Sequence, residues 1–333
     1  MDINTGSKVV RWGVLSAANI AVKSVIPAIA SARNGAFMAI ASRESDRASS
    51  IAARYTGAHA CASYDALLDD PEVDAVYIPL PNALHAEWSI RATQHGKHVL
   101  CEKPLAFHPA PVHDMFAAAR QSGVVLMEAF MYRLHPQMQW VLQQIEAGTI
   151  GQVHVVRSAF GFDLSKRTTD IRLSAALEGG SMMDVGCYPL SLCRAVYGQP
   201  VRSARAQVSV PAGFEVELAT AAVLDFGDGR TGVMDCSFMV PWHQFADITG
   251  EQGRIILNRP FTPGKSDTVV RIERGDEVTE RRFAGVDQYQ LEIEHFGDCV
   301  LNGTPLLISE ADALAQAEAI ETIYAAAGYQ LHR

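Results

Sequence analysis

The sequence lacks long hydrophobic runs and lacks an excess of positive charge. Its 333 residues contain no apolar stretch of roughly 18 residues, the minimum for a membrane-spanning helix, so we expect no membrane partner. The 28 Lys and Arg residues are outnumbered by 37 Asp and Glu residues, which gives a net charge of -9. A negative surface without a basic stripe repels a phosphate backbone, so we exclude nucleic acid as a partner.

Paired cysteines and targeting signals are also missing. The six cysteines are scattered, without a Cys-x-x-Cys pair or zinc-finger spacing. Because no histidine pair has a convincing third ligand beside it, we predict reduced, buried thiols and no metal. The first eight residues contain no apolar signal segment, so the sequence predicts a cytoplasmic protein.

The first third of the chain contains a regular alternation of strand and helix patterns. Short apolar runs predict strands at residues 9–15, 37–41, 74–78, 97–101 and 124–127. Helical spacing of apolar residues predicts helices at residues 19–32, 45–55, 83–95 and 112–121. This alternation is typical of an α/β domain with a doubly wound parallel sheet.

The pattern changes after residue 127. It predicts a helix at 136–147, a strand at 152–160, and three strands joined by tight turns at 201–240. Strands joined by tight turns are antiparallel, so we expect an α+β domain here.

A chain of this length exceeds the size of one hydrophobic core, which predicts two domains. We place them at residues 1–128 and 129–333, with a last helix at 309–326 that can pack back on either domain.

The predicted antiparallel sheet has one open face, and a partner subunit usually covers such a face. We therefore expect a homodimer or a higher oligomer.

Small residues occupy the turn between the first predicted strand and the first helix. Gly13, Ser16, Ala17 and Ala18 lie where a dinucleotide-binding turn uses glycines for close approach of the pyrophosphate. Only the first glycine is present. The turn is therefore either a modified dinucleotide-binding loop or a plain strand-to-helix connection.

The end of the second predicted strand carries Ser42 and Arg43. An acidic residue at this place binds the ribose of NAD, whereas a hydroxyl and a guanidinium suit the 2′-phosphate of NADP. The pair favours NADP. NAD stays possible because Glu44 follows directly, and an exposed surface arginine is the alternative interpretation.

Three further residues could carry chemistry. Lys103 follows Glu102 just past a predicted strand, at the sheet edge where ligands bind. Asp184 and Tyr188 are four residues apart, which places them on one face of a helix. A tyrosine whose pKa is lowered by a nearby lysine can exchange a proton with a substrate hydroxyl. The alternatives are a solvated lysine and a core tyrosine bonded to an aspartate.

Six motifs occur in a fixed order at residues 11–20, 39–43, 79–85, 98–104, 128–133 and 179–188. Together they resemble the Gfo/Idh/MocA family of oxidoreductases. The resemblance implies a Rossmann domain, followed by a domain with an open, mostly antiparallel sheet that often forms the oligomer interface. It implies that Lys103 lies beside the nicotinamide and the reacting carbon. The cofactor-binding residues that it implies are Gly13, Ser16, Ala17, Asn19, Ile20, Ser42, Arg43, Leu80, Pro81, Asn82, His85, Glu102 and Lys103.

Tyr188 stands where many family members have histidine. In this respect the chain is similar to NADP-dependent xylose and glucose dehydrogenases and to dimeric dihydrodiol dehydrogenases. We expect an NADP-dependent oxidoreductase that acts on a sugar or related polyol, with a pyranose as the first candidate. Tyr188 would exchange the proton, Lys103 would stabilise the alkoxide, and Asp184 would orient either the substrate or Lys103.

Other functions stay open. Reduction of a ketosugar and oxidation of a trans-dihydrodiol could use the same lysine and tyrosine. A dinucleotide-sensing regulatory protein would need no proton-transfer pair. Glycoside cleavage through transient oxidation would favour NAD, against the Ser42 and Arg43 pair.

Overall fold

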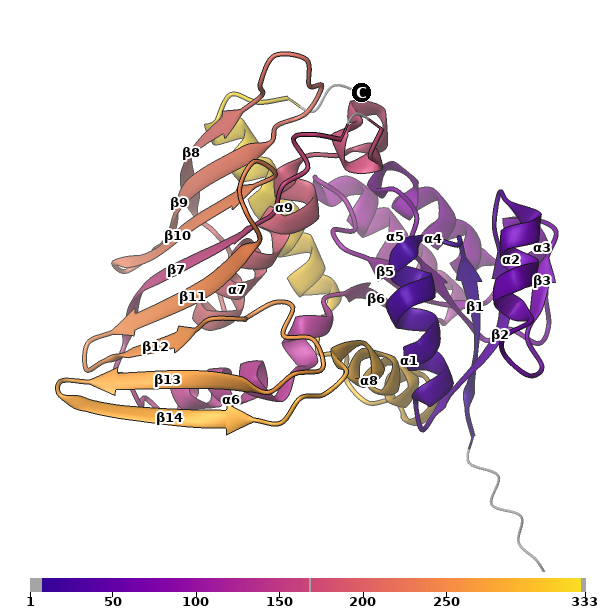
Figure 1. Cartoon of the computed structure of the whole chain (residues 1–333), viewed down its shortest axis with the longest axis horizontal. Helices are drawn as coiled ribbons and strands as arrows, with labels where there is room; N and C mark the ends of the chain where they lie inside the picture. The colour runs from indigo at the N-terminus through magenta and orange to yellow at the C-terminus, as the bar shows by residue number, and fades with distance from the viewer. Residues whose placement is uncertain (1–7, 168, 331–333) are drawn as a thin grey trace, which may run out of the picture.

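The chain folds into two β-sheets, each with its own helices (Figure 1). The computed structural model describes residues 8–167 and 169–330. Within these ranges, no helix combines the length and the apolar character needed to cross a bilayer.

The first sheet is parallel, with the strand order β3-β2-β1-β4-β5-β6 in the described residues. Its strands are β1 Val10–Leu15, β2 Gly35–Ala41, β3 His59–Cys61, β4 Ala75–Ile78, β5 His98–Glu102 and β6 Leu126–Ala129. The order reverses between β1 and β4, which is where doubly wound sheets bind their ligands. The predicted α/β class is confirmed.

Helices cover both faces of this sheet. They are η1 Ala21–Val25, α1 Ile26–Ser31, α2 Ser45–Ala52, α3 Tyr64–Leu68, η2 Asn82–Leu84, α4 His85–Gln94 and α5 Pro109–Ser122. Helices α3, α4 and α5 pack against one face, while α1 and α2 pack against the other. The sequence analysis missed β3 and α3. The strand has only three residues, without a run of large apolar side chains, and the helix is little more than one turn long.

The second sheet has the order β14-β13-β12-β11-β7-β10-β9-β8 in the described part of the chain. Its strands are β7 Val153–Gly161, β8 Ser203–Ser209, β9 Ala219–Gly227, β10 Arg230–Ser237, β11 His243–Gly250, β12 Arg254–Leu257, β13 Thr268–Arg274 and β14 Glu277–Phe283. All neighbours are antiparallel except β7 and β10. The predicted mostly antiparallel sheet is therefore confirmed, although strands β11 to β14 were not predicted.

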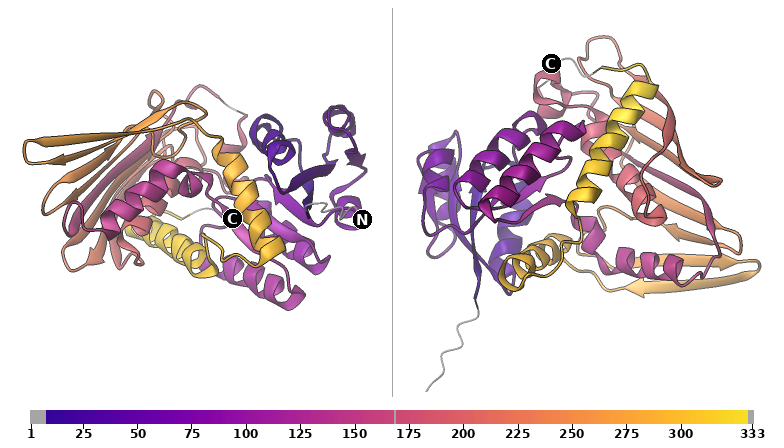
Figure 2. Two further views of the ribbon diagram at one scale, coloured as in Figure 1. Left: turned by 90° about the horizontal axis from the view of Figure 1, so that it is seen from below. Right: turned by 180° about the vertical axis from the view of Figure 1, so that it is seen from behind.

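The helices of the second sheet lie on the side that faces the first sheet. They are η3 Met131–Leu134, α6 Pro136–Glu146, η4 Ile171–Leu173, η5 Ala175–Leu177, η6 Met182–Gly186, α7 Cys187–Tyr197 and α9 Glu310–Ala326. No helix of the described residues covers the opposite face, which stands open in Figure 2. The open face agrees with the expectation from the sequence.

The last two helices tie the two units together. Helix α8, Gln288–Asn302, packs on α1, β1 and β2 of the first sheet although it follows the second sheet in sequence. Helix α9 contacts α5 on one side and α7 and β8 on the other. We propose a division near residue 128, just before the end of β6, with α8 returning to the first unit.

Candidate active site

A cavity of about 780 Å³ lies at the carboxyl ends of the parallel strands, between the two units. It brings together most of the residues that the sequence singled out. Those lining it are Ser16, Ala17, Asn19, Ile20, Ser42, Arg43, Leu80, Pro81, Asn82, Glu102, Lys103, Asp184 and Tyr188. The first eleven come from the first unit, and the last two come from the helix η6 and α7 of the second.

Gly13 and His85 lie outside this lining. Gly13 is inside β1, where a Cβ atom would lie 2.6 Å from Leu67 Cδ2, so its absent side chain allows α3 to pack on the strand. His85 is fully buried, and its ring nitrogens lie 2.9 Å from the carbonyl oxygens of Leu80 and Pro104. It joins two loops of the cavity wall, so its part in a cofactor site is indirect.

The loop after β1 adopts a conformation that normally belongs to glycine. Ser16 has a φ of 124°, a region that L side chains rarely adopt. Its backbone N–H donates to the Ala41 carbonyl at 2.9 Å, which fixes the loop to β2. The first turn of η1 has no side-chain cap. Its N–H groups therefore suit an anionic ligand such as a pyrophosphate.

Two residues that the sequence analysis missed complete the rim at Arg43. Arg47 lies on α2, four residues after Arg43, which precedes the helix, and it lines the same cavity. Tyr64 begins α3, and its hydroxyl lies near Ser16 and near the charge of Arg43. The spacing of Arg43 and Arg47 was visible in the sequence, whereas Tyr64 could not be placed because α3 was not predicted. Two guanidinium groups and a serine hydroxyl suit a phosphate group.

A chain of ionic contacts joins the two units at the bottom of the cavity. Lys103 Nζ donates to the Asp184 carbonyl at 2.6 Å and to Asp184 Oδ1 at 3.3 Å, and Asp184 Oδ2 is 2.8 Å from Arg172 Nε. Arg172 belongs to η4 in a loop without periodicity, so sequence spacing gave no signal for its role.

Burial and ion pairing together set the charges of Lys103 and Asp184. Burial lowers the pKa of Lys103, but Asp184 offsets this, and the pKa is raised above its ordinary value. Burial raises the pKa of Asp184, but Lys103 and Arg172 outweigh it and hold that pKa below its usual range. The site therefore contains an ammonium and a carboxylate.

Tyr188 lies against Lys103 in a different way from the sequence expectation. The ammonium is 4.9 Å from the centre of the tyrosine ring, and the hydroxyl donates to Met131 Sδ at 3.6 Å. Burial raises the pKa of Tyr188 well above its ordinary value, and Tyr289 and Glu102 add to this. The expected lowering of its pKa is wrong for this state, because Lys103 faces the ring and not the hydroxyl. Tyr188 holds its proton here.

A buried carboxyl group supports the turn that carries Asp184 and Tyr188. Glu217 Oε1 accepts hydrogen bonds from the Met182 N–H at 2.7 Å and from the Tyr324 hydroxyl at 3.2 Å. Gly180 has a φ of 117°, and a side chain there would overlap the Glu217 carboxyl group. Burial raises the pKa of Glu217 to about 8. The group is therefore largely protonated at neutral pH.

The protonation of Glu217 predicts a pH-dependent stability. Its ordinary pKa is 4.5, so between pH 4.5 and about 8 the native chain holds a proton that the unfolded chain has released. This contribution is fully present below pH 4.5 and is lost as the pH rises through 8, at up to about 1.4 kcal/mol per pH unit. Urea unfolding between pH 5 and 8 should show a shallower decline for Glu217→Gln than for wild type. Parallel curves for the two proteins would contradict this assignment.

Comparisons with known proteins cover both units. The model of the oxidoreductase family with an NAD-binding Rossmann fold, GFO/IDH/MocA, matches residues 10–130, and the model of the GFO/IDH/MocA C-terminal domain matches residues 138–256. A D-xylose 1-dehydrogenase (NADP(+)) of Haloferax volcanii is 38% identical over 318 residues, which cover 95% of this chain and 97% of the relative. A trans-1,2-dihydrobenzene-1,2-diol dehydrogenase of Xenopus tropicalis is 29% identical over 335 residues, covering 96% and 98%.

The structural comparison agrees with these matches. A 3-ketoreductase from Actinomadura kijaniata, in complex with NADP and TDP-benzene, has a TM-score of 0.90 at 34% sequence identity. The match covers 96% of this chain and 98% of that chain. These comparisons confirm the family resemblance and the two-sheet fold that the sequence predicted.

Proposed function

The chain belongs to the Gfo/Idh/MocA family of oxidoreductases, and we propose that it is an NADP-dependent dehydrogenase of a pyranose sugar. The observation that carries the proposal is that Lys103, Asp184 and Tyr188 line the same cavity as Arg43 and Arg47. A regulatory protein that only senses the dinucleotide has no need of a buried ammonium beside a tyrosine.

The residues present fit NADP. The backbone of Ser16 and Ala17 would hold the pyrophosphate, and Ser42, Arg43 and Arg47 would hold the 2′-phosphate. When bound, the coenzyme accepts a hydride from the substrate carbon or returns it. The xylose dehydrogenase of Haloferax volcanii is named as NADP-dependent, and the similar ketoreductase was solved with NADP.

Arg43→Ala and Arg47→Ala should each weaken the use of NADP⁺ selectively. A charge-assisted hydrogen bond contributes about 1.5 to 3 kcal/mol, so KM for NADP⁺ should rise roughly 10- to 100-fold for each variant. KM for NAD⁺ should stay within about twofold, because NAD⁺ has no 2′-phosphate. Initial rates with each coenzyme measure this. Arg54→Ala is the control, since Arg54 lies over the Tyr55 ring outside the cavity lining. Equal losses with both coenzymes would contradict the assignment.

The ammonium and the tyrosine divide the proton chemistry between them. Lys103 places a fixed positive charge where a substrate oxygen would become negative, and it thereby stabilises an alkoxide. Tyr188 exchanges the proton with that oxygen. Asp184 holds the ammonium in place from the other side, at 3.3 Å.

The protonated state of Tyr188 favours a second candidate, the reduction of a ketosugar. A protonated tyrosine can give its proton to a carbonyl oxygen directly, whereas in oxidation it must first release that proton. The similar 3-ketoreductase of Actinomadura kijaniata belongs to this class of activity. The two candidates differ in direction and in substrate, and they share the same residues.

Absorbance of the reduced coenzyme tests both candidates. We expect NADP⁺ reduction with one substrate class among aldoses, inositols and dihydrodiols. With that substrate, Tyr188→Phe should lower kcat about 100- to 10,000-fold, while the affinity for NADPH stays nearly unchanged. Tyr197→Phe is the matched control, because Tyr197 is a largely buried tyrosine whose hydroxyl bonds the Thr231 carbonyl outside the cavity lining.

Each outcome of this assay separates the candidates. Activity only with NADPH and ketosugars would replace the pyranose dehydrogenase by the reductase. Wild-type turnover in Tyr188→Phe would refute the proton role of this residue. Silence with every substrate in both directions would favour the sensing protein.

We further propose that the open face of the second sheet binds a second copy of the chain. Val223 of β9, Val233 of β10, Phe245 of β11 and Val269 of β13 expose 36% to 48% of their surface on this sheet. Val223 and Val233 are direct cross-strand neighbours. These apolar side chains are exposed on one face of the sheet, and exposed apolar groups gathered on one face often mark a protein interface.

Light scattering tests this proposal. Wild type should have twice the chain mass of 36.1 kDa, or a larger multiple, and the double variant Val223→Lys with Val233→Lys should shift toward the monomer, because it buries two charges in the interface. Val210→Lys is the control, since Val210 is exposed in the turn after β8. A wild-type monomer at micromolar concentration would refute the interface.

A further inference from the structure

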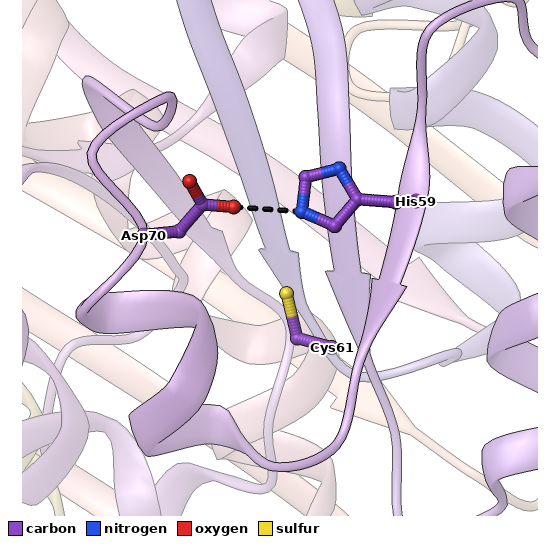
Figure 3. Close-up of side chains that lie close together, drawn as sticks. All are labelled: His59, Cys61 and Asp70. Atoms are coloured by element: carbon purple, nitrogen blue, oxygen red, sulfur yellow. Dashed lines mark hydrogen bonds and ion pairs between the residues drawn. The ribbon is translucent and has the colours of Figure 1, made fainter.

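Three side chains with metal-binding chemistry lie together at the edge of the parallel sheet (Figure 3). His59 and Cys61 are two residues apart on the edge strand β3, so their side chains share one face. Asp70 follows α3 and approaches that face, with Oδ2 at 2.7 Å from His59 Nε2. The nitrogen, sulfur and oxygen atoms all lie within 4.8 Å of one another. None of the three residues lines the cavity.

We propose that His59, Cys61 and Asp70 form a binding site for Zn²⁺. Imidazole, thiolate and carboxylate are the ligands that zinc takes in proteins. Zinc bonds of about 2.0 to 2.3 Å in a tetrahedron separate the ligand atoms by roughly 3.3 to 3.6 Å. To reach this spacing, the His59 nitrogen and the Asp70 oxygen, which are 2.7 Å apart, must separate by less than about 1 Å. The Cys61 sulfur, which lies within 4.8 Å of both, must move toward them.

The surroundings prepare Asp70 for this role. Its other oxygen, Oδ1, accepts a hydrogen bond from the Glu72 N–H at 2.8 Å, which leaves Oδ2 directed toward His59. The Lys97 ammonium donates to the carbonyl oxygens of Asp70 and Val73, both at 2.7 Å, and thereby fixes the loop. Contacts of this kind behind a ligand hold it in a binding orientation.

The fourth position of the tetrahedron is open to solvent. The His59 side chain is 42% exposed, so water can reach the ion and complete its coordination. On binding, the Cys61 thiol releases its proton to solvent and the sulfur bonds the metal as a thiolate, without any change of oxidation state. The site differs from a structural zinc finger in having three protein ligands.

A metal ion at this site would affect the cavity, because the site encloses a segment that carries a cavity residue. Between Cys61 and Asp70 the chain forms α3, whose Tyr64 lines the cavity and whose Leu67 packs beside Gly13. An ion held at both ends of this segment restrains α3 against the sheet. This second step rests on the proposed function, since it predicts that Zn²⁺ tightens NADPH binding by linkage.

Calorimetric titration of ZnCl₂ into the chelator-treated full chain tests the site without coenzyme or substrate. We expect one Zn²⁺ per chain with micromolar or tighter affinity, weakened more than about tenfold in Cys61→Ser and in His59→Gln. Co²⁺ in place of zinc should give a thiolate charge-transfer band that Cys61→Ser lacks. Cys299→Ser is the control, because that thiol has a single histidine neighbour, His295, at 3.6 Å.

The outcomes separate the two steps. No stoichiometric binding to wild type, or unchanged binding in both Cys61→Ser and His59→Gln, would overturn the site whatever the chain catalyses. Circular dichroism confirms that the variants fold. NADPH fluorescence titrations with and without Zn²⁺ then test the coupling, with an expected two- to fivefold tightening in wild type that is absent in Cys61→Ser. Equal NADPH affinities in the presence of bound zinc would overturn the coupling alone.

Discussion

The contact between Lys103 and Asp184 is the constraint on which the rest of the site depends. The lysine follows β5 in the first unit, and the aspartate lies on η6 in the second. Either charge would be costly to bury alone, because an unpaired ion loses its hydration without compensation. The two sheets must therefore meet in one arrangement, and the cavity lies where they meet.

In each unit, further contacts hold the charged residue of this pair in position. Glu102, which precedes the lysine, accepts a hydrogen bond from the Tyr77 hydroxyl at 2.6 Å and one from the Lys103 N–H at 3.2 Å. On the other side, Gly180 and the protonated Glu217 shape the start of η6. Arg172 gives the aspartate a second cation. Asp184 would thus keep a charged partner while Lys103 turns toward a substrate oxygen, so the pair can open without leaving a buried carboxylate alone.

The sequence predicted those parts of the site whose signal is local. Glu102 ends a clear apolar strand and Lys103 follows it, and the spacing of Asp184 and Tyr188 predicts that both lie on one helical face. Arg172 and Tyr64 lie on short turns without periodicity, and their roles exist only through partners far away in the chain. Strand β14 was missed for a related reason, since its exposed face and edge position leave charged residues where an apolar alternation would be expected.

Spacing also could not give the pKa of Tyr188. Proximity to a lysine was predictable, but the sign of the shift depends on which part of the tyrosine the ammonium faces and on how deeply the hydroxyl is buried. Both are properties of tertiary packing, set here by side chains from η3, β7 and α8.

The loop after β1 shows how a departure from a motif can leave its geometry intact. A serine replaces a glycine at residue 16, yet its φ of 124° is one that glycine would adopt without strain. The bond from its N–H to Ala41 and the contact of its side chain with Tyr64 hold that conformation. A loop of this type binds a pyrophosphate through backbone N–H groups. Binding therefore depends on the path of the loop backbone and not on glycine itself. Contacts with neighbouring residues can hold that path when the residue is a serine.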